Sequence, residues 1–141
     1  MRIMALDVGD RRIGVAISDP TGLLARQLMI ITRTDDSSDI QEVLRLVHEH
    51  APGKLIVGLP LLLNGDEGQQ AQKVQAFCNL LVPFLAIPLE AVDERFSTAT
   101  AREYMRQNSR RKKVVAKQHD DAMAAAVILQ NYLDEDLGRC I

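Results

Sequence analysis

The order of hydrophobic patterns along the chain is the feature that most constrains its fold. Three short apolar segments, residues 3–8, 13–18 and 25–32, come first and are separated only by Gly9-Asp10 and by Asp19-Pro20-Thr21-Gly22. Glycine tolerates positive φ and proline fixes φ, so these breaks predict tight turns within an antiparallel meander. Helical and strand patterns then alternate. This order predicts an α/β protein whose five-stranded mixed sheet has an antiparallel part and a parallel part, flanked by helices.

The later segments supply two strands and the helices that cover the sheet. Ser38 is the expected cap of a first helix, with Gln41 as its capping-box partner. A continuous apolar run at 55–59 predicts a strand covered on both faces. The remaining elements are expected as a helix through 71–81, a strand at 87–92, a short helix from Ser97 or Thr98 to about Gln107, and a last helix from Asp120 or Asp121 to about Asp134. Because residues 123–129 are apolar nearly all round, the last helix is expected to be buried.

Length and composition narrow the class of protein. A chain of 141 residues, 47% hydrophobic and 26% charged, is typical of one soluble globular domain, here residues 1–141. The sequence has no apolar stretch long enough to span a membrane. Cys78 and Cys140 are far apart and lack the paired spacing of a disulfide framework or a zinc site. A reducing cytoplasmic location is therefore expected.

Basic residues gather in one segment, although the net charge of the chain is −2. Between Arg102 and Lys117, seven basic residues face one acid, Glu103. Such a segment is often only a solvated surface. It precedes a pair of acidic residues, however, so we expect its central residues to contact the phosphates of a nucleic acid. These are Arg110, Arg111, Lys112 and Lys113.

Three acidic clusters stand at the ends of predicted elements. Asp7 interrupts an apolar strand, Asp93-Glu94 ends another strand, and Asp120-Asp121 opens the last helix. Taken alone, Asp7 could be a structural acid that accepts hydrogen bonds from the following turn. The carboxyl ends of parallel strands meet at one sheet edge, so the three clusters could converge there. Converging carboxylates repel one another unless a cation intervenes, and Mg²⁺ or Mn²⁺ is the cation that such ligands favour.

Several motifs together resemble one known family. They are Leu6-Asp7-Val8-Gly9 with Ile13-Gly14-Val15-Ala16, then Val57-Gly58-Leu59-Pro60, Asp93-Glu94-Arg95-Phe96-Ser97-Thr98 and Asp121-Ala122-Met123-Ala124-Ala125. In this order, over essentially the whole chain, they resemble the YqgF family, also called RuvX, of the ribonuclease-H-like superfamily. The resemblance implies a ribonuclease-H-like fold and a nuclease that matures the 5′ end of pre-16S rRNA in ribosome biogenesis. A Holliday junction resolvase acting on branched DNA is the alternative that the family also suggests.

The resemblance also implies roles for particular residues. Asp7, Glu94 and Asp121 match the acids that would be catalytic and bind Mg²⁺ or Mn²⁺, and Arg95 of the same motif is expected to contact nucleic acid. Two metal ions would then activate water and stabilise the leaving oxygen. The chain departs from the family at Asp10, where threonine is frequent. It also departs at Leu62, where asparagine is frequent.

Other readings of the sequence stay open at this stage. A strand acid followed by glycine also begins the phosphate loop of actin-like ATPases and sugar kinases, although that fold needs two such domains. A non-catalytic module that binds nucleic acid through its basic segment is the second alternative. His119, next to Asp120, has a weaker claim to the site. The sequence leaves open a monomer or a homodimer.

Overall fold

The five predicted strands form one mixed sheet. The computed structural model describes residues 1–62, 64–93 and 116–139, with residues 116–122 and 136–139 described by their backbone only. The strands are β1 (Ile3–Val8), β2 (Arg12–Ser18), β3 (Ala25–Thr32), β4 (Lys54–Leu59) and β5 (Leu89–Asp93). The helices are α1 (Asp36–His50), α2 (Gln69–Leu81), the short 3₁₀ helix η1 (Val82–Phe84) and α4 (Ala116–Arg139).

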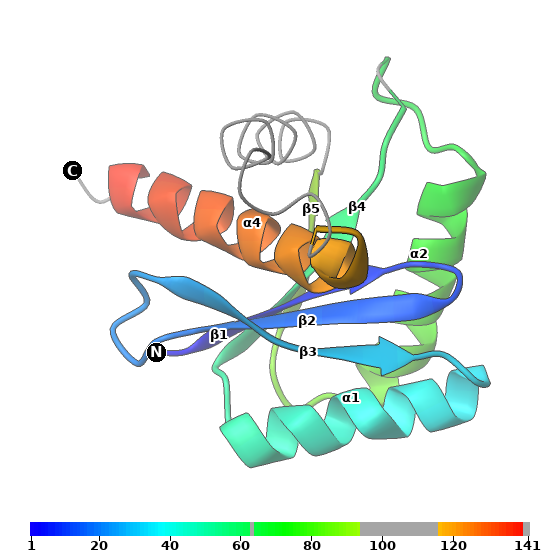
Figure 1. Ribbon diagram of the computed structural model, residues 1–141, viewed down its shortest axis with the longest axis horizontal. Coiled ribbons are helices and arrows are strands. Elements are labelled where there is room, and N and C mark those ends of the chain that lie inside the picture. Colours follow the sequence, from blue (N-terminus) through cyan, green and yellow to red (C-terminus); the bar gives the residue numbers. More distant parts are fainter. Residues whose placement is uncertain (63, 94–115, 140–141) are drawn as a thin grey trace.

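The sheet has the order β3-β2-β1-β4-β5, with β1 in the centre (Figure 1). β1 pairs antiparallel with β2, and β2 antiparallel with β3, which confirms the predicted meander. β1 pairs parallel with β4, and β4 parallel with β5. The carboxyl ends of β1, β4 and β5 therefore lie at the same edge of the sheet, here called the carboxyl edge.

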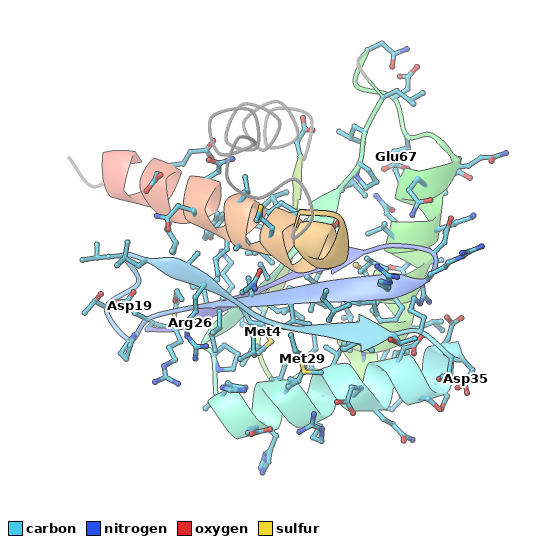
Figure 2. The ribbon with its side chains drawn as sticks, in the orientation of Figure 1. Met4, Asp19, Arg26, Met29, Asp35 and Glu67 are labelled. Carbon is cyan, nitrogen blue, oxygen red and sulfur yellow. The ribbon has the colours of Figure 1, made fainter. Side chains whose placement is uncertain are left out.

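Strand alternation divides the core into two layers. Met4 and Leu6 of β1 belong to the cluster that packs against α1 and α2, whereas Ile3 and Ala5 belong to the cluster that packs against α4. Figure 1 shows α4 on one face of the sheet and α1 on the other. Figure 2 shows the side chains of Met4 and Met29 between the sheet and α1. Because helices cover both faces, the inner strands are almost continuously apolar, as predicted for residues 55–59.

The predicted cap of the first helix is wrong. α1 begins at Asp36, and its N-cap is Asp35, whose carboxylate accepts hydrogen bonds from the Ser38 backbone N–H at 2.8 Å and from Ser38 Oγ at 3.0 Å. Ser38 therefore donates to the cap instead of providing it. Aspartate and serine are equally good caps, and Asp35 is placed so that its side chain reaches the third N–H of the helix.

Two expectations for the last helix are also wrong. α4 begins at Ala116 instead of Asp120 or Asp121, because Ala116, Lys117 and Gln118 are all good helix formers. The helix is not buried all round. One face is buried against the sheet, through Ala125, Ile128, Leu129 and Leu133. Met123 and Val127 instead line an open groove of about 480 Å³ between α4 and β3.

Two further sequence expectations concern other parts of the chain. The short helix expected from Ser97 or Thr98 to about Gln107 lies outside the described residues. Among the residues that the structure describes, no helix combines the length and the apolar character needed to cross a membrane.

Candidate active site at the carboxyl edge of the sheet

Asp7 lies at the centre of the carboxyl edge. It is the second-last residue of β1 and is half-buried, whereas its neighbours Leu6 and Val8 are buried. Strand alternation puts Asp7 on the same face as Ile3 and Ala5, which is the face that α4 covers. A carboxylate at the end of the central strand is therefore presented on the α4 face of the sheet.

Both neighbouring strands place a glycine beside Asp7. Gly14 of β2 lies directly opposite Asp7 in the antiparallel pair. On the other side, Leu6 is in register with Val57 of β4, so Gly58 follows next to Asp7. A glycine inside a strand often marks a place where a ligand or another backbone approaches closely. No side chain from β2 or β4 therefore occupies the positions beside the Asp7 carboxylate.

Asp93 also lies at the carboxyl edge, but on the face of the sheet opposite to Asp7. It is the last residue of β5 and lies in register with Leu59 of β4. Val92, one residue earlier, packs with the cluster under α4, so strand alternation assigns Asp93 to the opposite face from Asp7. Glu94 and Arg95, which follow in the sequence, lie outside the described residues.

The direction of α4 brings its first turns toward the carboxyl edge. The Gln130 side chain accepts from the Ala25 N–H at 2.9 Å and donates to the Leu23 carbonyl at 3.0 Å, so the second half of α4 lies over the start of β3. β3 is parallel to β1, and the first half of α4 therefore runs toward the end of β1. Position 121 is one helical turn before Ala125, which is fully buried against the sheet. Of Asp121, Asp120 and His119, the structure describes the backbone only.

Asp10 lies apart from Asp7. Its carboxylate is 3.4 Å from the Lys73 ammonium, and Lys73 belongs to α2, on the face opposite to α4. Both side chains are well exposed, so water and salt screen this pair strongly. This pairing holds the Asp10 carboxylate beside α2, on the face opposite to α4, and not beside Asp7.

The remaining predicted site residues belong to the basic segment. Arg110, Arg111, Lys112 and Lys113 lie outside the described residues. Among residues 1–62, 64–93 and 116–139, the described side chains include no group of three carboxylate, histidine or cysteine residues able to hold a metal ion. The donor chemistry of Asp7 nevertheless fits Mg²⁺ or Mn²⁺, since a carboxylate offers the hard oxygen ligand that these ions favour.

The turn after Asp7 is held by a network that the sequence did not indicate. The Gly9 N–H donates to the Arg12 carbonyl at 2.8 Å, and a Cβ on Gly9 would meet that carbonyl oxygen at 2.9 Å. The Arg33 guanidinium donates to the Gly9 carbonyl at 2.9 Å. Glycine is therefore required here by the close approach of Arg12.

Arg33 is itself fixed by three groups. Its Nε contacts the Asp39 carboxylate at 3.0 Å, its Nη2 contacts Asp36 at 2.9 Å, and its guanidinium lies 5.2 Å from the centre of the Phe77 ring. Asp39 is only 2% exposed and also accepts the Thr34 N–H at 3.1 Å. The network thus links the turn after Asp7 to the beginning of α1.

Comparison with solved structures defines the class of fold. The chain matches T. thermophilus RuvC, solved in complex with a Holliday junction substrate, with a TM-score of 0.64. The match covers 98% of this chain and 97% of that chain at 18% sequence identity. At this level of identity the likeness concerns the fold, which is the RuvC-like form of the ribonuclease-H-like class, as the sequence predicted.

Comparison of sequences identifies the family. Residues 1–135 match the RuvX family, which is described as Holliday junction resolvase. A relative from Dehalococcoides mccartyi is 47% identical over 133 residues, which cover 94% of this chain and 98% of the relative. A second relative, from Roseiflexus sp., is 45% identical over 138 residues and 94% of each chain. Both carry the name "Putative pre-16S rRNA nuclease". The chain belongs to the RuvX family, and with it to the nucleases that hydrolyse phosphodiester bonds.

Proposed function

We propose that this chain is one metal-dependent nuclease domain, residues 1–141, that processes the 5′ end of pre-16S rRNA in the cytoplasm. The observation that carries the proposal is the position of Asp7, at the end of the central strand between Gly14 and Gly58. The names of the relatives that are 45–47% identical over nearly the whole chain support rRNA as the substrate.

Three acids are proposed to hold Mg²⁺ or Mn²⁺, namely Asp7, Glu94 and Asp121. Support for this set comes from three different elements that approach one edge. β1 carries Asp7 there as its second-last residue, β5 ends there directly before Glu94, and α4 runs toward it with position 121 one turn before Ala125. When bound, such ions would activate water and stabilise the leaving oxygen of a phosphodiester.

The chain's own residues orient the reaction in this proposal. Asp7 is held within a strand that is hydrogen-bonded on both sides, so its carboxylate needs little reorganisation to bind a cation. Gly14 and Gly58, which are both buried, keep the positions beside it free of side chains from β2 and β4. Arg95 and the basic residues Arg110, Arg111, Lys112 and Lys113 are proposed to contact the neighbouring phosphates.

Cleavage of defined substrates tests the proposal. Precursor rRNA and a four-way DNA junction are each incubated with the protein and Mg²⁺ or Mn²⁺. We expect metal-dependent cleavage of the rRNA, which Asp7→Asn abolishes. Glu135→Gln is the matched control, because Glu135 is exposed in the second half of α4, away from the carboxyl edge. Absence of cleavage with either metal, with rRNA binding retained, would favour the non-catalytic binding module.

A Holliday junction resolvase is the second candidate. The description of the RuvX family and the match to RuvC over 98% of the chain favour it. Symmetric cleavage of the DNA junction, with the precursor rRNA left intact, would identify this activity. Two strands would then be cut by two active sites, so sedimentation should find a homodimer on the junction. On precursor rRNA a monomer is sufficient.

A further inference from the structure

Two adjacent arginines lie close to Asp7 in the sequence, with Arg11 in the β1–β2 turn and Arg12 at the start of β2. We propose that Arg11 and Arg12 bind the phosphate backbone of the nucleic-acid substrate, as a contact separate in sequence from the basic segment 102–117. The inference rests on the proposed nuclease function, because it assigns these arginines to the same substrate. It adds a binding element that the family resemblance did not indicate.

The position of Arg12 relative to Asp7 supports this assignment. Arg12 is the first residue of β2 and is exposed. It is two residues from Gly14, which lies opposite Asp7, so strand alternation puts Arg12 on the same face of the sheet as Asp7. Two residues of strand span about 7 Å. If one phosphate of a nucleic acid binds at Asp7, a neighbouring phosphate would therefore lie within reach of the long Arg12 side chain.

The backbone of the turn is held in place before any substrate binds. The Arg12 carbonyl accepts the Gly9 N–H at 2.8 Å, and the Arg11 carbonyl accepts the Arg33 N–H at 2.9 Å. The Arg33 side chain holds the Gly9 carbonyl as well. A loop that is already ordered loses less conformational entropy when it binds. The ordered backbone therefore lowers the entropic cost of a contact at this turn.

The charges around the turn suit a polyanion. The acid of the turn, Asp10, lies 3.4 Å from Lys73 of α2, on the face opposite to Asp7, so its negative charge is balanced there and lies away from Arg12. Arginine is well suited to bind a nucleic-acid backbone, because its planar guanidinium can donate two parallel hydrogen bonds to one phosphate. Arg11 and Arg12 are both exposed. If the two arginines had a purely structural role, their replacement would not change the affinity for the substrate.

Salt-dependent binding tests the proposal without requiring cleavage. Affinity for a short single-stranded RNA and for a four-way DNA junction is measured in EDTA over a series of salt concentrations. Each lost phosphate contact should reduce the log–log slope by about 0.7 on the single strand and about 0.9 on duplex DNA. For Arg11→Gln with Arg12→Gln we therefore expect a reduction of about 1.4 on the RNA or about 1.8 on the junction. Arg11→Lys with Arg12→Lys should restore most of the slope, because the charges remain.

The matched control removes two exposed arginines elsewhere. Arg26→Gln with Arg45→Gln produces the same change in net charge, and it should leave the slope unchanged. Arg26 lies on β3 near Asp19, at the other end of the sheet from the β1–β2 turn (Figure 2), and Arg45 lies on α1. Melting temperatures of all variants verify that they are folded.

Two outcomes would overturn the proposal. One is an unchanged slope in the Arg11→Gln, Arg12→Gln protein, and the other is wild-type protein that binds neither nucleic acid. If the proposed nuclease function is wrong but the two arginines do bind phosphates, the experiment gives another result. Wild-type protein would then bind but not cleave with Mg²⁺ or Mn²⁺, while the slope in EDTA would still fall on loss of the two arginines.

Discussion

The Arg33 guanidinium donates a 2.9 Å hydrogen bond to the carbonyl oxygen of Gly9, which connects the turn after Asp7 to the first turn of α1. The same guanidinium contacts the Asp39 carboxylate, which is 2% exposed. A buried carboxylate is tolerated only when charged or polar partners compensate it. The turn beside the candidate active site therefore depends on an ion pair that the fold itself needs.

Loss of Arg33 is expected to destabilise the protein. Arg33→Met leaves Asp39 buried with only the Thr34 N–H as a described hydrogen-bond donor, and we expect the free energy of unfolding to fall by roughly 2–4 kcal/mol. Urea denaturation measures this change. Arg45→Met on the exposed surface of α1 is the control and should have little effect. A fall as small as in that control would show that the ion pair with Asp39 is dispensable.

Much of the fold could be predicted from local patterns, but the network around Arg33 could not. The alternation of apolar residues and the positions of glycine and proline gave the meander and the parallel strands, because those signals act over a few residues. Arg33 and Gly9 are 24 positions apart, and no local pattern connects them. The cap of α1 does not follow from the sequence, because Asp35 and Ser38 are both suitable and only the helix geometry decides between them.

The candidate site was predictable to a similar degree. The sequence indicates Asp7 because a charged residue there interrupts an otherwise apolar strand. Its placement between Gly14 and Gly58 depends on strand register, which is fixed by pairing across the sheet and not by the sequence near Asp7. The roles of Glu94 and Asp121 stay predictions.

Added bulk at Gly14, which is buried opposite Asp7, is expected to reduce activity. Gly14→Ala puts a methyl group opposite Asp7, and we expect the rate of cleavage to fall roughly tenfold or more, equivalent to about 1.4 kcal/mol in the barrier. Initial cleavage rates and melting temperatures are measured together. Ala91→Val is the control, since Ala91 is exposed in β5 and lies two strands from Asp7. Full activity in Gly14→Ala would mean that the position opposite Asp7 tolerates a side chain.

A second ion pair predicts how stability changes at alkaline pH. Hydrogen bonds to Glu90 and then to Tyr132 raise the pKa of Lys54 above its ordinary value of 10.5. The charged lysine therefore stabilises the fold below pH 10.5, and this contribution is lost as the pH rises through the higher pKa of the folded state. Lys54, Glu90 and Tyr132 join β4, β5 and α4, so their loss should loosen the amino-terminal end of the sheet.

Glu90→Gln tests this dependence. We expect the variant to melt at a lower temperature than wild type near neutral pH, and the difference to shrink above pH 10.5. The change should be modest, because the Glu90 side chain is 44% exposed and solvent screens the pair. Glu49→Gln, which alters an exposed pair with Arg45, is the control and should give a difference that is small at every pH. A Glu90→Gln profile parallel to wild type would contradict the expectation.

The last prediction concerns Asp7 as part of an electrostatic unit with Glu94 and Asp121. If the three carboxylates converge, their repulsion destabilises the metal-free fold, so Asp7→Asn should raise the metal-free melting temperature while it abolishes cleavage. Mn²⁺ should stabilise wild type by RT ln(1 + [L]/Kd), or about 2.7 kcal/mol at a hundred times Kd, and stabilise the variant much less. Thermal melts with and without Mn²⁺ measure both effects.

Asp10→Asn is the control that separates this unit from nearby negative charge. Asp10 is close in sequence but is paired with Lys73 on the other face, so its loss should leave the full response to Mn²⁺. A reduced response in Asp10→Asn would mean that general acidity near the edge attracts the metal. If Asp7→Asn instead lost stability and kept the full response, Asp7 would be a structural acid that accepts hydrogen bonds at the strand end. The metal site would then have to be sought around Asp93 and Asp120.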